Sequence, residues 1–179
     1  NRDQIDQFAT ALFKYASEGS FISLRAFYDK RKGQSAFAIE PVQINGTGLG
    51  PVVNLAAQMA TRCANATKAI VFCPPVVTFQ TGDSAKADNV AEGIALSAEC
   101  DAMPKAARVK LEALLGAATA VVASGGQWIN PETGEVQDKL HLHWRLKKPT
   151  TTPEDHALLK RAREMATALV GGDTTNIPL

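Results

Sequence analysis

The alternation of hydrophobic and polar positions divides the chain into two successive sets of helices and strands. Apolar residues at helical spacing predict helices over residues 3–16, 50–65, 104–116 and 152–172. Short apolar or alternating runs predict strands over residues 21–29, 35–44, 68–72, 93–101, 118–124 and 139–146. The predicted order is α-β-β-α-β followed by β-α-β-β-α, with a polar loop over residues 78–89.

The second set is one strand short of the ferredoxin-like β-α-β-β-α-β unit. We therefore expect an α/β (α+β) chain, with an N-terminal α/β subdomain over residues 1–90 and an RRM-like or ferredoxin-like subdomain over residues 91–179. The missing strand is expected to begin near Asp173 or beyond Leu179. Because the chain starts without Met and stops abruptly, we expect it to be a piece of a longer protein.

The expected neighbours at the centre of this second sheet both carry pairs of polar residues. The first strand ends in Glu99 and Asp101, and the third carries His141 and His143. Side chains two residues apart point to the same face of a strand. If the acidic pair and the histidine pair point to the same face of the sheet, four side chains able to bind a metal lie in one patch.

Composition narrows the partners that this patch can have. The net charge is +1, so no global basic field attracts nucleic acid, and such a partner must be held by a local patch. The three cysteines are scattered and form no CxxC pair, which argues against a disulfide framework or a zinc site and fits a reducing cytoplasm. The longest apolar run, residues 69–77, is broken by Pro74 and Pro75, so no membrane partner is expected.

Two carboxylates on one strand face repel each other unless a cation lies between them. Oxygen ligands suit Mg²⁺ or Mn²⁺, and Asp173, after the last predicted helix, could supply a third carboxylate. Three acids and a histidine are the residue types that two-metal phosphoryl transfer uses. The alternative is a solvated strand end in which Asp101 caps the following helix.

The histidines and the Ser124-Gly125-Gly126 segment also allow alternatives. The histidines could be exposed residues of an edge strand, with Trp144 packed on the opposite face. His-Leu-His also fits the metal-binding pattern of HUH-type replication initiators and relaxases, which need a tyrosine nucleophile, but the two tyrosines here are far upstream. The Ser-Gly-Gly segment could bring backbone amides to a phosphate, although a β-bulge or hairpin entry is favoured.

With these segments in order, the chain resembles the archaeo-eukaryotic primase superfamily, and in particular the primase-polymerase domains of phage and plasmid replication proteins. The strand "ALSAECD" is similar to the family's acid-x-acid motif. "VVASGG" with "KLHLHWRL" is similar to its second motif, and "VGGDTTN" to its single third acid. This chain has Glu99 where the family more often has Asp, and His143 where relatives often have an aromatic residue.

The resemblance implies metal-dependent, template-directed nucleotidyl transfer by a DNA primase or polymerase. It implies the following site residues: Glu99, Asp101 and Asp173 as ligands of Mg²⁺ or Mn²⁺; His141 or His143 at the phosphates of the nucleotide; and Ser124 and Gly125 beside them. Arg25 and Lys147 are further candidates for phosphate or template contact, because of their charge near the expected site. The implied partners are a single-stranded DNA template, nucleoside triphosphates and a fused or associated helicase. Further candidates for template contact are Lys30, Arg31, Lys32, Lys148 and Trp128.

A non-catalytic nucleic-acid-binding domain on the primase fold is a further reading of the same motifs. It would bind nucleotide or single-stranded DNA without metal and without forming product. The sequence alone leaves this reading open beside the primase and the HUH readings.

Overall fold

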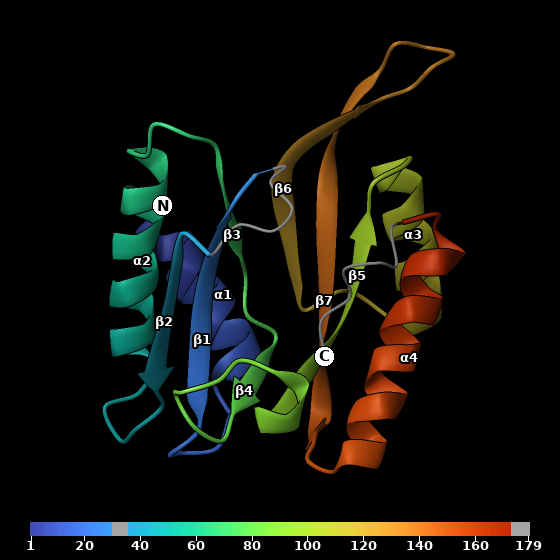
Figure 1. Cartoon of the computed structure of the whole chain (residues 1–179). Helices are drawn as coiled ribbons and strands as arrows, with labels where there is room; N and C mark the ends of the chain where they lie inside the picture. Colours follow the sequence, from blue (N-terminus) through green and yellow to red (C-terminus); the bar gives the residue numbers. More distant parts are fainter. Residues whose placement is uncertain (30–35, 173–179) are drawn as a thin grey trace. The chain divides into compact units, whose positions relative to one another are not determined.

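A computed structural model of the chain describes residues 1–29 and 36–172. The chain is mixed α+β, and it divides into two compact units, Asn1–Ile94 and Ala95–Leu179. Strand β5 (Val90–Cys100) runs without a break across the boundary, so it belongs to both units (Figure 1).

The first unit is an antiparallel sheet with two helices. Its elements are α1 (Arg2–Phe13), β1 (Phe21–Tyr28), β2 (Ala38–Gln43), α2 (Gly50–Ala64), β3 (Ile70–Cys73), β4 (Val77–Phe79), the 3₁₀ helix η1 (Ala87–Asn89) and the start of β5. β1 pairs with β2 along one edge and with β3 and β4 along the other, and β4 pairs with β5. Alternate residues of β1, namely Ile22, Leu24 and Ala26, are buried in the core.

A buried carboxylate connects the elements of this unit. Glu92 of β5 is only 6% exposed. It accepts hydrogen bonds from the Ser17 backbone N–H (3.1 Å), the Ser17 hydroxyl (2.8 Å) and the Thr78 hydroxyl (3.0 Å). Three donors satisfy a buried carboxylate well, so Glu92 anchors the segment after α1 to the sheet.

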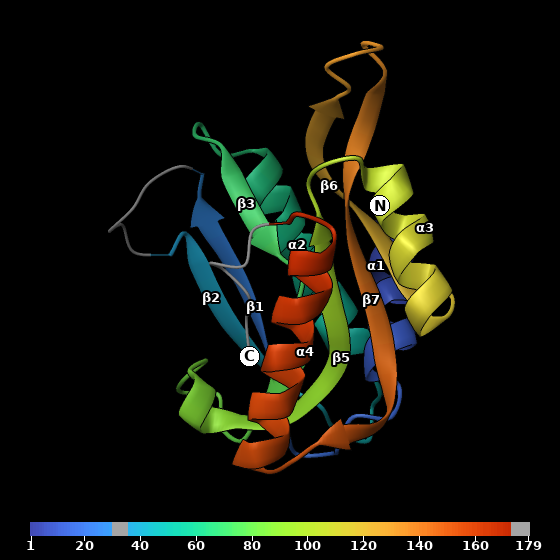
Figure 2. The same ribbon diagram turned by 90° about the vertical axis from the view of Figure 1, so that its right-hand side faces the viewer.

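The second unit has the predicted order β-α-β-β-α. It consists of the end of β5, α3 (Pro104–Leu115), β6 (Ala120–Ile129), β7 (Val136–Thr150) and α4 (Pro153–Leu169). β7 lies between β5 and β6, so the predicted neighbourhood of the first and third strands is confirmed. Figures 1 and 2 show the β6–β7 hairpin extending past the N-terminal end of α3.

The helix boundaries follow the predicted local signals. Pro104 is the first residue of α3, and Gly116 ends it with φ +81°. The Thr152 hydroxyl accepts a hydrogen bond from the Asp155 N–H (3.2 Å) and so caps α4. The residue before α3, Met103, has φ +45°, a left-handed conformation that non-glycine residues rarely adopt.

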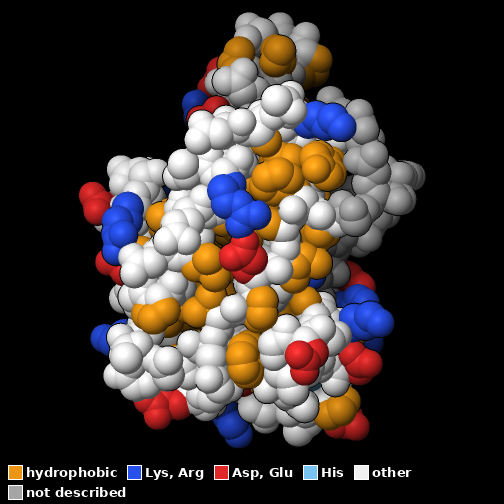
Figure 3. Space-filling model, turned by 60° about the vertical axis from the view of Figure 1, so that its left-hand side comes forward, with side chains coloured by type: hydrophobic (Ala, Val, Ile, Leu, Met, Phe, Trp, Pro, Cys, Tyr) orange, Lys and Arg blue, Asp and Glu red, His pale blue; other side chains and the backbone are white. Residues whose placement is uncertain are grey.

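Charged side chains of both signs lie on the face drawn in Figure 3. Figure 3 shows one face of the molecule, on which Lys and Arg side chains alternate with Asp and Glu among hydrophobic and polar atoms. This mixture agrees with the net charge of +1. No helix within the described residues is long and apolar enough to cross a membrane.

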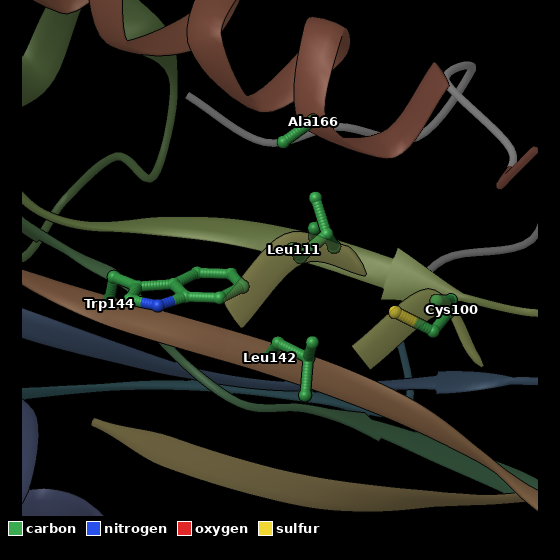
Figure 4. Packing of buried hydrophobic residues seen from close by; sticks show 7 residues of the cluster. Cys100, Leu111, Leu142, Trp144 and Ala166 are labelled. Carbon is green, nitrogen blue, oxygen red and sulfur yellow. The ribbon is translucent and has the colours of Figure 1, made fainter. Parts of the chain in front are cut away.

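The core of the second unit lies on one face of its sheet. Ala98 and Cys100 of β5 and Leu142 and Trp144 of β7 pack against Leu111 of α3, and the cluster also contains Ala107 and Ala166 (Figure 4). The Trp144 indole donates a hydrogen bond to the Gly116 carbonyl (2.8 Å). Both helices therefore cover the face formed by even-numbered residues of β5 and β7.

The structure differs from the predictions most at β4, β6 and β7. The predicted loop over residues 78–89 contains the end of β4, a buried strand of three residues that is too short to show a period. β6 and β7 are both longer than predicted, over Ala120–Ile129 and Val136–Thr150. Backbone hydrogen bonds between the two antiparallel strands extend the pairing along the hairpin. They keep polar and glycine-rich residues in the sheet.

Candidate functional site

The odd-numbered residues of β5 and β7 form the candidate site. Because even-numbered residues face the helices, their odd-numbered neighbours face the opposite side of the sheet. The predicted residues Glu99, Asp101, His141 and His143 all lie on this side. The structure therefore brings both polar pairs to one face.

Three side-chain pairs cross between the strands on this face. Ser97 Oγ lies 2.9 Å from His143 Nδ1, and His141 Nε2 lies 4.0 Å from Glu99 Oε1. Lys139 Nζ lies 3.2 Å from Asp101 Oδ1. Residue numbers rise along β5 from Ser97 to Asp101, while those of their partners on β7 fall from His143 to Lys139. The two strands are therefore antiparallel.

The two histidines have different surroundings. His143 is 4% exposed, whereas the His141 side chain is 29% exposed beside the Glu99 carboxylate. Burial, with smaller contributions from the charges of His141 and Arg163, lowers the pKa of His143 to about 4. His143 is therefore neutral at pH 7 and bonded to Ser97, and His141 is the histidine with surface to offer a ligand.

The acidic end of β5 carries a negative field. Burial raises the pKa of the neighbouring Cys100 thiol to about 11, and the charges of Asp101 and Glu99 contribute to the rise. This thiol is protonated at neutral pH and lies on the helix-covered face. It is therefore neither a nucleophile nor a metal ligand of the site.

Lys139 and Ser97 were missed by the sequence reasoning. The same alternation that selected His141 and His143 also selects Lys139, two residues earlier on β7. Its ammonium group pairs with Asp101, and both side chains are 34% exposed. Asp101 is thus paired across the strands, and it does not cap α3, whose N-cap residue Met103 makes no side-chain capping bond.

Ser124 and Gly125 lie in a β-bulge of β6. The pairing with β7 shifts between Ala123, opposite Leu140, and Gln127, opposite Asp138, and Gly125 has φ +85°. The prediction of a bulge is therefore confirmed. A Cβ at the next residue, Gly126, would lie 3.0 Å from Lys139 Cδ, so the bulge borders the Lys139 side chain.

The remaining predicted residues lie elsewhere on β7, in the first unit, or outside the described residues. Lys147 is exposed on β7, six residues beyond His141, or about 20 Å along the strand. Arg25 belongs to β1 of the first unit, opposite Ile39 and Cys73. The predicted residues Asp173, Lys30, Arg31 and Lys32 lie outside the described residues.

The last described residue, Gly172, lies against β5. A Cβ at Gly172 would be 2.5 Å from the Glu99 carbonyl oxygen and 2.7 Å from Thr167 Cγ2. Only a residue without a side chain fits this contact. At Gly172 the chain after α4 therefore lies against the backbone of β5.

The donors on this face suit a hard divalent cation in kind, because two of them are carboxylates. Among residues 1–29 and 36–172, however, no three His, Cys, Asp or Glu side chains are grouped closely enough to hold a metal ion. The predicted third ligand, Asp173, is not among these residues. Lys139 also holds one of the two carboxylates.

Comparisons with known proteins found no relative. No family model matches the chain, and no curated protein and no solved structure matches it.

Proposed function

We propose that the chain is a primase-polymerase domain that catalyses template-directed, metal-dependent nucleotidyl transfer. One observation carries the proposal: two carboxylates and a partly exposed histidine lie on one face of two neighbouring strands in a β-α-β-β-α unit. The strand order β5-β7-β6 agrees with an RRM-like or ferredoxin-like sheet. The motif resemblance supports the same reading.

In this proposal the residues divide the work as follows. Glu99 and Asp101, with Asp173, hold Mg²⁺ or Mn²⁺, and His141 contacts the phosphates of the incoming nucleotide. The bulge at Ser124 and Gly125 borders the nucleotide path. When bound, the divalent cations would supply activation of a 3′-hydroxyl and neutralisation of the triphosphate. The chain itself contributes positioning on two hydrogen-bonded strands.

Primer synthesis and extension on single-stranded DNA, with Mg²⁺ or Mn²⁺ and nucleoside triphosphates, tests the proposal. We expect Asp101→Asn to lower the rate at least about a hundredfold, because a neutral amide binds the cation poorly. Asp138→Asn is the matched control, since Asp138 is an exposed residue of β7 at an even-numbered position. Equal activity of Asp101→Asn and the wild-type chain would contradict the metal assignment.

The HUH reading is less well supported by the geometry. A relaxase-type site needs both histidines at the metal, but His143 is buried and bonded to Ser97. Both tyrosines belong to the first unit. A covalent adduct between either tyrosine and a DNA 5′-phosphate would favour that reading over ours.

A non-catalytic nucleic-acid-binding domain is favoured by one specific observation. The Lys139 ammonium group neutralises Asp101 in the position where a catalytic cation would be expected. Nucleotide binding that is independent of metal, with no product formed, would support this second candidate.

A further inference from the structure

We propose that a small aromatic cavity of the first unit binds one nucleotide of a single-stranded nucleic acid, with the base against Tyr28 and the phosphate on Lys68. Tyr28 is the last residue of β1, and Phe37 directly precedes β2. Residues 66–68, between α2 and β3, complete the lining of the cavity. The inference needs no metal and uses no residue of the candidate site on β5 and β7.

Backbone hydrogen bonds hold the walls of this cavity. The Phe37 N–H donates to the Ala26 carbonyl (2.8 Å), and the Asp29 N–H donates to the Ala69 carbonyl (3.0 Å). Both bonds continue the pairing of β1 with its neighbours β2 and β3. The lining therefore needs little ordering when a ligand binds, which favours affinity.

The size of the cavity favours one unit of a polymer over a whole small molecule. Its volume is about 230 Å³. Sites that enclose a small molecule usually measure roughly 300–1,000 Å³. A single base can enter the smaller cavity while the rest of the strand remains outside it.

Two aromatic rings form the apolar part of the lining. Tyr28 and Phe37 are arranged edge to face, with their ring centroids 5.8 Å apart. Both side chains are partly buried, so each keeps part of its surface accessible. Nucleic-acid bases stack on such rings irrespective of their sequence, because every base has a π-face.

Two cations lie beside the rings. Lys68 Nζ lies 5.7 Å from the centroid of the Tyr28 ring, and Arg62 Cζ lies 5.9 Å from that of Phe37. Arg62 also forms an ion pair with Glu40, whereas Lys68 forms none within the described residues. No acidic side chain is among the described residues that line the cavity. Lys68 is therefore the cation that remains to meet a phosphate.

The contact between Lys68 and Tyr28 can be exchanged for a ligand. The lysine is exposed, and cation–π contacts at exposed sites are weak. A base that enters the cavity takes the place of the ammonium group at the ring. The long side chain of Lys68 then allows its ammonium group to move to the phosphate of the same nucleotide.

Fluorescence anisotropy of a labelled single-stranded DNA oligonucleotide, titrated with the whole chain in the presence of EDTA, tests this site. We expect Tyr28→Leu, which keeps an apolar side chain but removes the ring, to weaken binding about tenfold. Tyr28→Phe keeps the ring and should bind like the wild-type chain. Lys68→Met should weaken binding and reduce the slope of log K against log salt concentration by about 0.7.

A second lysine and tyrosine provide the matched control. Lys14 Nζ lies 5.4 Å from the centroid of the Tyr15 ring, but neither residue lines the cavity. Lys14→Met and Tyr15→Leu should therefore leave the affinity and its salt dependence unchanged. Lys68→Met changes an exposed residue, so it keeps the test decisive even if Tyr28→Leu fails to fold.

The outcomes separate this inference from the proposed function. Weaker binding by Tyr28→Leu and Lys68→Met, with Tyr28→Phe and both controls at the wild-type affinity, supports the cavity as the site. Equal affinity of the wild-type chain, Tyr28→Leu and Lys68→Met overturns it, and so does the absence of any binding of the strand. A free nucleoside triphosphate that binds where the strand does not would also overturn it. Primer extension is measured separately, so the proposed function can stand when this inference fails.

Discussion

His143 is neutral at physiological pH because it is buried. Its pKa of about 4 in the folded chain is below the ordinary value of 6.5, with burial as the main cause. Between these two pH values the unfolded chain binds a proton that the folded chain does not. Folding stability therefore falls as the pH drops through this window, by at most about 3 kcal/mol.

Replacement of His143 by Gln should remove this part of the pH dependence. We expect the free energy of unfolding of His143→Gln to change less between pH 7 and pH 4.5 than that of the wild-type chain. Urea unfolding at both pH values measures the difference, and comparing the two changes excludes any general loss of stability in the variant. Parallel losses in both proteins would contradict the assignment.

At the scale of single residues, the sequence predicted the two polar pairs but not the state of their side chains. Strand alternation placed Glu99 with Asp101 and His141 with His143, and it left open whether the two pairs share a face. It could not show that His143 is buried, because burial depends on packing from distant parts of the chain. It also could not show that the Lys139 ammonium group forms an ion pair with Asp101 rather than extending into solvent.

Helix α4 is attached to β5 by a buried arginine. Arg163 is fully buried, and its Nε and Nη2 donate hydrogen bonds to the Ala95 carbonyl at 3.1 and 2.6 Å. Burial lowers the pKa of Arg163 to about 10, so the group remains charged at neutral pH. The helical pattern of α4 indicated neither that Arg163 is buried nor that it donates to the Ala95 carbonyl.

We expect Arg163→Met to lower the free energy of unfolding by about 2–3 kcal/mol, because a carbonyl that accepted two charged hydrogen bonds becomes unsatisfied. Arg163→Lys should lose less, since an ammonium group can still donate to Ala95. Denaturant unfolding of the three proteins measures this order. A methionine variant within 0.5 kcal/mol of the wild-type chain would contradict the role of the two bonds.

The junction between α4 and β5 depends on the absence of a side chain at Gly172. A methyl group there would lie 2.5 Å from the Glu99 carbonyl oxygen, so the chain has to move. We expect Gly172→Ala to destabilise the chain by about 1–3 kcal/mol, measured by thermal or urea unfolding.

Gly50→Ala is the matched control for Gly172→Ala. Gly50 begins α2 and has no atom within 4 Å of its Cβ position, so alanine should be neutral or slightly stabilising there. Equal effects at the two positions would show that the contact with Glu99 is unimportant.

Helices were predicted better than strands because their ends carry local signals. Pro104, Gly116 and Thr152 mark boundaries through backbone constraints that neighbouring residues alone determine. Strand lengths depend on partners distant in sequence, so the extension of β6 through Ser124-Gly125-Gly126 was not predictable from local pattern.

At the scale of the whole molecule, the two units share a strand. β5 continues through Ile94 and Ala95, the residues on either side of the boundary. Loss of this strand would remove an element from each unit at once. We therefore expect the chain to unfold in a single cooperative transition.

The positions of the tryptophans allow this to be measured. Trp128 and Trp144, the only tryptophans, belong to the second unit, whereas far-ultraviolet circular dichroism reports on helices of both. Urea unfolding curves from tryptophan fluorescence and from circular dichroism should coincide. Two separated midpoints would show that the units unfold independently despite β5.

The alternation of polar and core residues along β5 and β7 limits which changes of sequence this chain can accept. Odd positions supply the polar patch and even positions supply the core, so the two kinds of residue alternate along the same two strands. A single-residue insertion or deletion before Glu99 within β5 would turn its carboxylate toward the helices and a small apolar residue toward the patch. A point substitution leaves this alternation intact, whereas length changes in these strands should survive only in pairs, or where a bulge such as that of β6 absorbs them.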